Sequence, residues 1–358
     1  MAAESKRRVA VVSPEPTPYR APLFDAIAER PELELTVIYA AETVAGRTWT
    51  VEPHHCAVFL RGPGLPGAHA LLHHDYPITP GILRVLSEAR PDCVVVSGWS
   101  TFAAQAAIAW CLVRKVPYLL IVESHDEGPR AGWRNLVKGT VVPPIVRRAA
   151  GVLVTGTLAR RSMLARGARI DRVWVFANTI DVEAWQARAA GLSGRRDELR
   201  GSFGFEPDEV AVLCVARPAP EKGLDTLEAA VAAAGDPLRL FVVHDLPHDR
   251  VLEAYAAADI FALLSRREPW GVVVNEAAAC GLPLILSDRV GAAPDLLRDH
   301  ENGYVVPADE VPAAAEALRR LIQPQARRRM GERSAELARG WGYGPSIENF
   351  VAAVREAP

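Results

Sequence analysis

Short apolar, β-branched runs alternate with helix-like stretches along most of this chain, and this alternation constrains the fold more than any other feature. Six runs fall in the first half: VAVVS (9–13), LELTVIYA (33–40), CVVVSG (93–98), YLLIVES (118–124), GVLVTG (151–156) and RVWVFAN (172–178). Runs that are apolar throughout are typical of strands buried on both faces, and strands separated by helices form parallel sheets. The first half therefore predicts one doubly wound α/β sheet.

A second series of strand-like runs follows a polar, arginine-rich stretch, GLSGRRDELRGSFG. Its members are AVLCVA (211–216), RLFVVHD (239–245), IFALLS (260–265), PLILSD (283–288) and GYVVPA (303–308). We therefore predict a second sheet, a hinge near 178–193, and a cleft beyond the carboxyl ends of the strands, where ligands of doubly wound folds bind. The predicted regions are an N-terminal domain (1–185), a C-terminal domain (186–340) and a terminal helix (341–358) that crosses back to the first domain.

The composition narrows the class of ligand. The chain has 358 residues, of which 49% are hydrophobic and 23% charged, which is typical of a soluble protein with two domains. Its formal net charge of -2 at pH 7 gives no overall attraction to nucleic acid or anionic lipid. We therefore expect no nucleic-acid partner, and any anionic ligand has to be held by locally placed cations. A monomer or a homodimer would fit this composition.

Several local features predict a cytoplasmic protein. The five cysteines are scattered without a CxxC pair, as is typical of reduced, buried thiols. The basic N-terminus is apolar only as far as Val12 and is followed by two prolines, which makes it a poor signal peptide. The longest apolar stretch, around 106–113, is far shorter than the roughly 20 residues that span a bilayer.

Two cations follow directly after a predicted strand. The run AVLCVA continues into RPAPEKGLDTLEAAV, so Arg217 and Lys222 lie in a loop between a strand end and a helix. Helix N-termini supply free amides and Arg and Lys supply full charges, so this loop predicts a diphosphate site. A solvated turn is the alternative, because many loops carry such residues. No Asp-x-Asp pair is placed like a metal-binding diphosphate site, and we expect no metal.

Two glutamates bracket the apolar stretch REPWGVVVNEAAACGLP (267–283). Glu268 falls in the loop after IFALLS, and Glu276 falls on a helix that starts near Gly271, roughly 7.5 Å further along its axis. The two carboxylates can thus reach different parts of one extended ligand. Alternatively, Glu268 is an acid that favours a helix start and Glu276 is a solvated surface residue. An ionised Glu276 in so apolar a helix needs hydrogen-bond partners, and a pair of ribose hydroxyls would serve.

These motifs resemble a known family. VARPAPEKGLDTL and YAAADIFALLSRREPWGVVVNEAAACGLPLILSDRVGAAPDLLRDHENGYVVP are similar to the C-terminal half of the retaining, sugar-nucleotide-dependent GT-B glycosyltransferases of family 4. The Glu-x7-Glu spacing from Glu268 to Glu276 is the most recognisable element. VWVFANTID, RPDCVVVSGWS and RAAGVLVTGT are also similar to this family. The resemblance covers about 79–310, is strongest over 211–308, and is weak over 41–78.

The resemblance implies a GT-B fold, with two Rossmann-like, doubly wound α/β domains that face a cleft. It also implies retaining transfer of a hexose from a nucleotide-diphosphate sugar, with UDP-hexose as our guess, to a hydroxyl of an unidentified acceptor. No metal and no cofactor beyond this co-substrate are expected. Three alternatives remain open: a non-catalytic sugar-nucleotide-binding protein, a sugar-nucleotide epimerase on the same frame, and a phosphorylase, which the lack of an evident pyridoxal-binding lysine motif disfavours.

The resemblance also implies roles for the residues of the second domain. Arg217 and Lys222 would bind the donor diphosphate, and Glu276 would accept hydrogen bonds from both ribose hydroxyls. Glu268 would hold the donor sugar and distal phosphate together with backbone amides, or would stabilise the developing oxocarbenium ion as a catalytic residue. The amides are those of Trp270, Gly271 and Val272.

Candidates in the first domain follow its predicted strands. His125, after YLLIVES, matches a histidine that this family often places near the donor sugar, and a loop or capping histidine is the alternative. Asp126 could act on the acceptor hydroxyl or belong to a solvated acidic loop. Tyr19 and Arg20, in SPEPTPYRAPLF, stand where many relatives carry a glycine-rich loop. They either project to the cleft mouth and contact the acceptor or form a fixed turn.

The chain departs from the family pattern most clearly between Lys222 and Tyr255, and two other segments carry separate predictions. Between Lys222 and Tyr255 there is room for only one strand, so we predict a second domain short by one βα unit. The segment 41–80 reads as an extended insertion without a long periodic element, and its two His-His pairs read as surface or acceptor-loop residues: His54, His55, His73 and His74. The basic, apolar stretch 133–151 could make weak peripheral membrane contact, although two prolines interrupt it.

Overall fold

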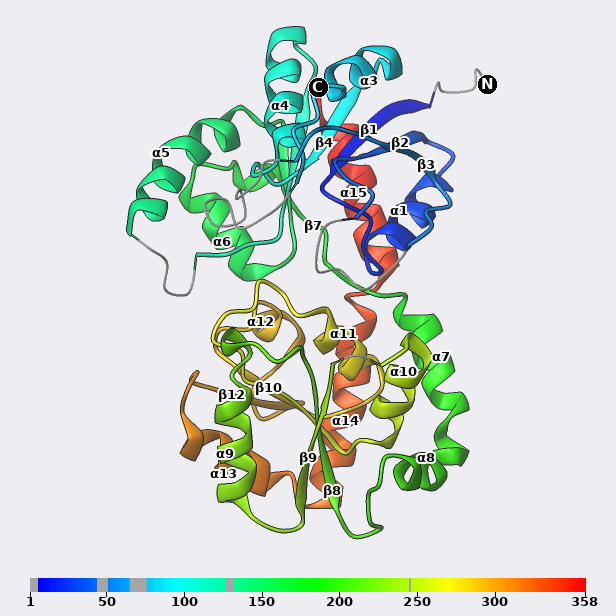
Figure 1. Ribbon diagram of the computed structural model, residues 1–358, viewed down its shortest axis with the longest axis vertical. Coiled ribbons are helices and arrows are strands. Elements are labelled where there is room, and N and C mark those ends of the chain that lie inside the picture. Colours follow the sequence, from blue (N-terminus) through cyan, green and yellow to red (C-terminus); the bar gives the residue numbers. More distant parts are fainter. Residues whose placement is uncertain (1–5, 44–50, 65–75, 127–131, 245) are drawn as a thin grey trace.

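The computed structural model describes residues 6–43, 51–64, 76–126, 132–244 and 246–358. It has two parallel sheets, each covered by helices, which form the two lobes in Figure 1. The first sheet has strand order β3-β2-β1-β4-β5-β6-β7 and the second has the order β12-β11-β10-β8-β9. This is the predicted doubly wound α/β architecture with two domains.

The strands of the first sheet are β1 (Arg7–Ser13), β2 (Leu33–Tyr39), β3 (Cys56–Phe59), β4 (Cys93–Ser97), β5 (Tyr118–Val122), β6 (Gly151–Val154) and β7 (Val173–Val175). Each of the six predicted runs overlaps one of them. The exception is β3, which lies in the stretch interpreted as an insertion without a regular element. This strand pairs on one side only, with β2, and its side chains are partly exposed, so its sequence lacks a buried strand's continuous apolar character.

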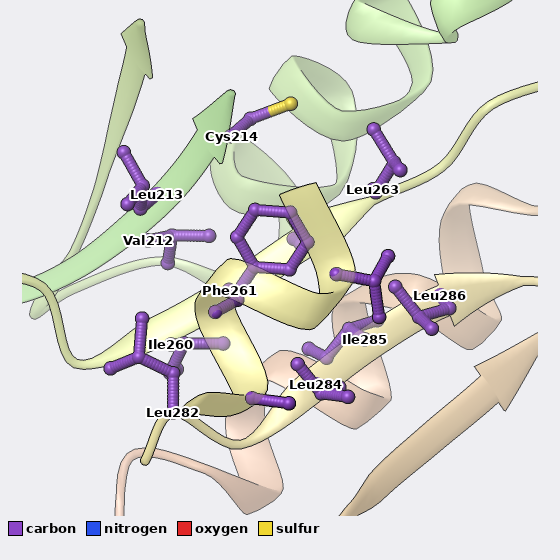
Figure 2. Close-up of a cluster of buried hydrophobic side chains, with 14 of the residues drawn as sticks. Val212, Leu213, Cys214, Ile260, Phe261, Leu263, Leu282, Leu284, Ile285 and Leu286 are labelled. Atoms are coloured by element: carbon purple, nitrogen blue, oxygen red, sulfur yellow. The ribbon is translucent and has the colours of Figure 1, made fainter. Parts of the chain in front are cut away.

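The strands of the second sheet are β8 (Val210–Val215), β9 (Leu238–Val243), β10 (Ile260–Leu263), β11 (Leu284–Ser287) and β12 (Gly303–Val306). All five were predicted. Only β9 lies between the helices α9 (Leu224–Ala234) and α10 (His248–Ala257), as expected for a domain short by one βα unit. Figure 2 shows how β8, β10 and β11 pack their side chains around Phe261, which is fully buried.

The remaining helices cover the two sheets. Those of the first lobe are α1 (Ala21–Ala28), α3 (Ile82–Ala89), α4 (Phe102–Arg114), α5 (Gly132–Arg148) and α6 (Thr157–Ala165). Those that follow are α7 (Val182–Gly191), α8 (Arg196–Ser202), α11 (Val272–Ala279), α12 (Ala293–Leu296), α13 (Val311–Arg320), α14 (Pro324–Arg339) and α15 (Tyr343–Glu356). The α5 helix continues through Pro143 and Pro144, where the sequence predicted an interruption.

The core explains why the strand sequences are apolar throughout. In the first sheet, Val9, Val11 and Val95 face one hydrophobic cluster, whereas Val12 and Val94 face another on the opposite side. Successive residues of a strand point to opposite faces, so burial of both faces demands an unbroken apolar run.

The chain passes between the lobes twice. After β7 it enters α7, whose Val182 and Trp185 belong to the core of the second lobe, so the predicted boundary at 185 falls inside a second-lobe helix. On the return, α15 lies on the first lobe (Figure 1), where Phe350 is fully buried with its ring 5.4 Å from that of Phe176. Trp341 packs against Trp270 of the second lobe, with ring centroids 5.4 Å apart.

Candidate active site

A pocket of about 260 Å³ lies where the two lobes meet. Ser124 and His125 reach it from the loop after β5, and the other lining residues come from the loops after β8 and β10. Those other residues are Arg217, Glu221, Lys222, Arg267, Glu268 and Pro269. Every contribution therefore comes from the carboxyl end of a parallel strand, which is where the sequence predicted a cleft.

Lys222 and Glu268 form an ion pair in this pocket, with the ammonium group donating to the Oε2 atom of the carboxylate. Their side chains are 25% and 12% exposed, so the pair is largely shielded from water. Gly223, which has a φ of 63°, allows the two loops to meet: a Cβ atom there would lie only 2.2 Å from the carbonyl oxygen of Leu264. The structure thus brings together two residues that sequence reasoning assigned to one ligand.

Two arginines in the same pocket are not engaged by the protein. Arg217 and Arg267 are both exposed, and within the described parts of the chain neither guanidinium forms a hydrogen bond or an ion pair. Sequence reasoning missed Arg267, although its place beside Glu268 at a strand end was a usable signal. Its neighbour Arg266 instead binds the protein, with ion pairs to Asp309 (2.6 Å) and Asp225 (2.7 Å).

The Glu268 loop is held by the segment that follows β11. The amide of Gly291 donates to the Glu268 carbonyl (2.9 Å), and the amide of Ala292 donates to the Trp270 carbonyl (3.0 Å). A Cβ atom on Gly291 would lie 2.0 Å from the carbonyl oxygen of Pro269, so only glycine permits this approach. These bonds place the Glu268 loop directly before α11, whose first amides have no intrahelical partners.

Of the predicted donor-sugar group, only Glu268 lines the pocket. The indole of Trp270 is buried and donates from its Nε1 atom to Oδ1 of Asn275 (3.0 Å), so this side chain is part of the protein interior. Gly271 has a φ of 94° and precedes the start of α11 at Val272, and the first backbone amides of a helix have no partners within that helix. The structure therefore leaves these residues only their predicted backbone role.

His125 connects the first lobe to this loop. Its side chain is buried, with the residue only 3% exposed, and its Nε2 atom lies 3.1 Å from the backbone carbonyl oxygen of Glu268. Because a carbonyl oxygen can only accept, the Nε2 atom carries the hydrogen. The histidine predicted to lie near the donor sugar thus sits in the pocket and contacts the Glu268 main chain across the cleft.

Glu276 lies outside the pocket lining, in a different environment. It is partly buried on α11, and the phenol of Tyr255 donates to its Oε2 atom (2.8 Å). Burial raises the pKa of Glu276 to about 7, an effect that the Tyr255 hydrogen bond partly opposes. The predicted cost of an ionised carboxylate in this apolar helix is therefore present in the structure, with one protein partner instead of two ribose hydroxyls.

The predicted acceptor residues are placed less favourably. Arg20 does not project to the cleft mouth: it is only 5% exposed, stacks 4.4 Å from the centre of the Phe176 ring, and donates to the Ala177 carbonyl (3.2 Å) and to Asn178. Its position as the residue before α1 directs it into the junction between the lobes. Tyr19, just before it, is partly exposed.

Asp126 is exposed but paired. Both of its carboxylate oxygens accept from Arg166, with one contact at 2.8 Å, and its backbone amide donates to the hydroxyl of Ser162 (3.1 Å). The side chain is 38% exposed and that of Arg166 is 14% exposed. This salt bridge fixes the start of the loop after β5, so Asp126 would have to leave Arg166 to act on an acceptor.

The interpretation of the histidine pairs as surface residues is wrong for His55. Its ring is buried between Asp25, whose Oδ1 atom lies 2.6 Å from Nδ1, and Tyr39, whose hydroxyl lies 3.0 Å from Nε2. Burial lowers the pKa of His55. It packs against Phe24 because β3 is part of the sheet. His73 and His74 lie outside the described residues.

Within the described part of the chain, no group of three or more His, Cys, Asp or Glu side chains is arranged to hold a metal ion. Nor does any helix within those residues combine the length and apolar character needed to cross a bilayer. In the stretch predicted to touch a membrane, Val141, Arg147 and Arg148 are exposed, and membrane contact stays a prediction.

Two family matches cover most of this architecture. Residues 3–179 match the family described as Glycosyl transferase 4-like domain, which spans the first sheet. Residues 227–337 match the family described as Glycosyl transferases group 1, which spans α11 and most of the second sheet. The two matched segments occur in the order that the strand pattern and the Glu-x7-Glu motif predicted.

Individual relatives agree with these matches. The D-inositol 3-phosphate glycosyltransferase of Xylanimonas cellulosilytica is 29% identical over 327 residues, which cover 78% of this chain and 77% of the relative. The alpha-D-kanosaminyltransferase of Streptomyces kanamyceticus is 28% identical over 275 residues, covering 65% and 69%. The fold is similar to that of Anabaena HepE, solved in complex with UDP and glucose, with a TM-score of 0.74, 16% identity and coverage of 98% of this chain and 100% of that one. The chain therefore belongs to the GT-B glycosyltransferases of family 4.

Proposed function

We propose that this glycosyltransferase moves a hexose from a nucleoside diphosphate sugar to an acceptor hydroxyl, with retention of anomeric configuration and without a metal ion. The observation that carries the proposal is the pocket between the lobes, where the Lys222–Glu268 pair lies beside Arg217 and Arg267, whose guanidinium groups have no partner among the described residues. A site with several cations and one carboxylate suits a ligand that is anionic at one end and becomes cationic at the other.

The cations serve the leaving group. When the anomeric bond breaks, negative charge accumulates on the departing diphosphate, and preplaced cations stabilise that charge in the transition state. Arg217 and Lys222 are the proposed diphosphate ligands, and Arg267 adds a third positive charge from the facing loop. Two charge-assisted contacts at roughly 1.5 to 3 kcal/mol each would lower the barrier by about 3 to 6 kcal/mol. This charge is the proposed substitute for a divalent cation.

Glu268 serves the donor sugar. Its ion pair with Lys222 places a carboxylate next to the proposed diphosphate site, so the two ends of the breaking bond meet opposite charges. The amides of Trp270, Gly271 and Val272, at the start of α11, would hold the sugar and the distal phosphate. Glu268 can bind sugar hydroxyls, stabilise the oxocarbenium ion, or do both from this position.

His125 completes the pocket from the first lobe. The bond from its Nε2 atom to the Glu268 carbonyl fixes the orientation of the imidazole ring against the proposed sugar site. The ring is also buried, and the surrounding protein therefore restricts its motion. We propose that His125 acts there as the catalytic contact of the first domain with the donor sugar.

Glu276 binds the ribose of the nucleotide in this proposal. Burial destabilises the ionised form of this carboxylate and raises its pKa to about 7, so new hydrogen-bond donors would stabilise the ionised form. Two ribose hydroxyls would supply such donors in addition to Tyr255. Donor binding would then be coupled to release of a proton near neutral pH.

The sugar nucleotide and the acceptor are proposed by class. HepE, which has a similar fold, was solved with UDP and glucose, and this supports UDP-hexose as the donor. The relative named as a D-inositol 3-phosphate glycosyltransferase supports a polyol hydroxyl as acceptor, and the relative named as an alpha-D-kanosaminyltransferase supports transfer of a sugar group. Tyr19 stays the proposed acceptor contact because it is partly exposed in the loop between β1 and α1, and Arg20 and Asp126 are bound within the protein.

Titration calorimetry tests the proposal. UDP, GDP, dTDP and ADP are titrated in the presence of chelator into the wild-type protein and into Glu276→Ala. We expect one nucleotide to bind without metal and the variant to lose most of that affinity. Binding of none to the wild type would overturn the donor site. A turnover assay separates the alternatives. Nucleotide release that requires an acceptor would support glycosyl transfer. Nucleotide binding without turnover would favour a sugar-nucleotide-binding protein, and interconversion of the sugar without an acceptor would favour an epimerase.

A further inference from the structure

The first turn of α6, in the first lobe, is capped by a residue of the second lobe. The residue before this helix is Gly156, which has no side chain to cap it. Instead, the carboxylate of Asp295, on α12, accepts from the Thr157 amide (2.8 Å) and from the Thr157 hydroxyl (2.5 Å). A carboxylate in this place satisfies a free amide and favours the helix dipole, as an N-cap within one helix does.

The contact is tightly packed. A Cβ atom on Gly156 would lie 2.3 Å from the Oδ2 atom of Asp295 and 2.4 Å from the Trp270 ring, so any larger residue would separate the two lobes. Asp295 is only 5% exposed, and its burial raises the pKa of the carboxyl group. A carboxylate so far removed from water depends on its partners, and these partners are in the other lobe.

The same segment holds the Glu268 loop. Gly291 and Ala292 donate to the carbonyls of Glu268 and Trp270, and Asp295 follows one helical turn later. The segment 291–295 is therefore bonded to the proposed donor loop at one end and to the first lobe at the other. Figure 1 shows α12 at the edge of the second lobe that faces α6.

We propose that Asp295 is a positioning residue that couples closure of the two lobes to the geometry of the donor loop. With the lobes together, Asp295 caps α6 and His125 reaches the Glu268 carbonyl. With the lobes apart, α6 has an uncapped first turn and Asp295 loses both donors. The cap thus stabilises the arrangement in which the pocket contains residues from both lobes. Its effect on catalysis rests on the proposed function, whereas its effect on closure does not.

Small-angle X-ray scattering on the full chain tests closure. Asp295→Ala is expected to give a larger radius of gyration than the wild type, measured without ligand. The matched control is Thr101→Ala, which removes a helix cap that lies within the first lobe, where the side chain accepts from the Ala104 amide (3.1 Å). The control is expected to lower the melting temperature without changing the scattering profile. Identical profiles for Asp295→Ala and the wild type would overturn the proposal.

Thr157→Val provides a second test in case Asp295→Ala does not fold. This nearly isosteric variant removes the hydroxyl donor but keeps the amide, so it should open the lobes less than Asp295→Ala. If closure is needed for productive donor binding, the donor KM rises by about tenfold in Asp295→Ala while kcat changes little, because saturating donor restores the closed form. Unchanged KM in both variants, at a temperature where they are folded, would contradict the coupling. An inactive wild type would defeat the proposed function but leave the scattering test intact.

Discussion

The surroundings of the two glutamates in the Glu-x7-Glu motif differ in almost every respect. Glu268 faces the pocket and is paired with Lys222, so the protein itself supplies its counter-charge. The Glu276 carboxylate accepts from the Tyr255 phenol, and burial raises its pKa to about 7. In the proposed function, the protein preorganises the Glu268 carboxylate, whereas ribose hydroxyls would stabilise the Glu276 carboxylate. In this proposal, the Lys222–Glu268 part of the site is complete before the ligand binds, whereas the Glu276 part is completed by binding.

The largest expected effect on turnover comes from breaking the Lys222–Glu268 ion pair. Lys222→Ala removes a cation from the proposed diphosphate site and leaves the Glu268 carboxylate, only 12% exposed, without its partner. A charge-assisted contact is worth roughly 1.5 to 3 kcal/mol, so we expect turnover to fall by about one to two decades. The initial rate of nucleotide release at saturating donor measures this change.

Arg217→Ala is the control for that substitution. It also removes a cation from the pocket, but its side chain has no partner within the described residues, so no buried carboxylate is left unpaired. We expect a fall of about tenfold, which should shrink at high salt because exposed charges are screened. Near-wild-type rates for both variants, with unchanged circular dichroism, would refute the diphosphate assignment.

The charge of Glu276 should make nucleotide affinity depend on pH. The ionised form is the one that accepts from ribose hydroxyls, so nucleotide affinity should weaken as pH falls below about 7. Between pH 8 and pH 6 the loss should be about tenfold, since each unit below the pKa costs about one decade of the ionised form. Calorimetry in buffers of different ionisation enthalpy should also detect proton release on binding. In Glu276→Gln the affinity should be low and independent of pH over this range.

The raised pKa of Glu276 should also make the free energy of unfolding depend on pH. The pKa of Glu276 is higher in the folded protein than its ordinary value of 4.5, so its contribution to stability is fully present below that value. The contribution is lost as the pH rises through about 7. The free energy of unfolding of Glu276→Gln, measured by denaturant titration, should therefore exceed that of the wild type by more at pH 8 than at pH 5. The opposite trend would mean that Glu276 is stabilised as the anion.

A smaller effect is expected from Tyr255→Phe. The Tyr255 hydroxyl donates to Glu276 and opposes the rise in its pKa, so its loss should shift the pH midpoint of nucleotide binding upwards from about 7. Loss of one hydrogen bond should lower the free energy of unfolding by about 1 kcal/mol. Trp185→Phe, which removes the neighbouring indole donor to Cys280, is a control that should lower stability without moving the midpoint. An unmoved midpoint in Tyr255→Phe would show that this phenol does not set the charge of Glu276.

The second sheet and the donor side of the pocket could be predicted because they depend on local signals. Buried parallel strands are apolar throughout, and residues that follow such strands meet at one edge of the sheet. Arg217, Lys222 and Glu268 were found in this way. Arg267 was missed although its place beside Glu268 was a usable local signal; which of the two adjacent arginines is left for a ligand depends on distant partners, because Arg266 binds Asp225 and Asp309.

The acceptor side could not be predicted with the same accuracy, because there the outcome depends on contacts between distant parts of the chain. The partners of Arg20 include Ala177 and Asn178, more than 150 residues away, and no local pattern announces them. His55 is buried only because β3 joins the sheet at its edge, and edge strands leave a weak apolar signal. The Asp295 cap depends on how two separate lobes meet, so it was invisible in the sequence.

The smallest effect on turnover is expected from Asp126→Asn, a substitution in the first lobe, across the cleft from the two glutamates. If Asp126 were the base for the acceptor hydroxyl, Asp126→Asn would reduce turnover by about 10²-fold or more. In the structure, however, both carboxylate oxygens accept from Arg166, and this partly exposed pair is worth no more than about 1 kcal/mol to folding. We therefore expect turnover within about twofold of the wild type. The rate is measured with the acceptor varied, because an increase in acceptor KM alone would mean that the carboxylate binds the acceptor without taking its proton. A large fall in kcat would instead show that Asp126 leaves Arg166 during the reaction, and the acceptor side would then be completed by binding, as the Glu276 region is.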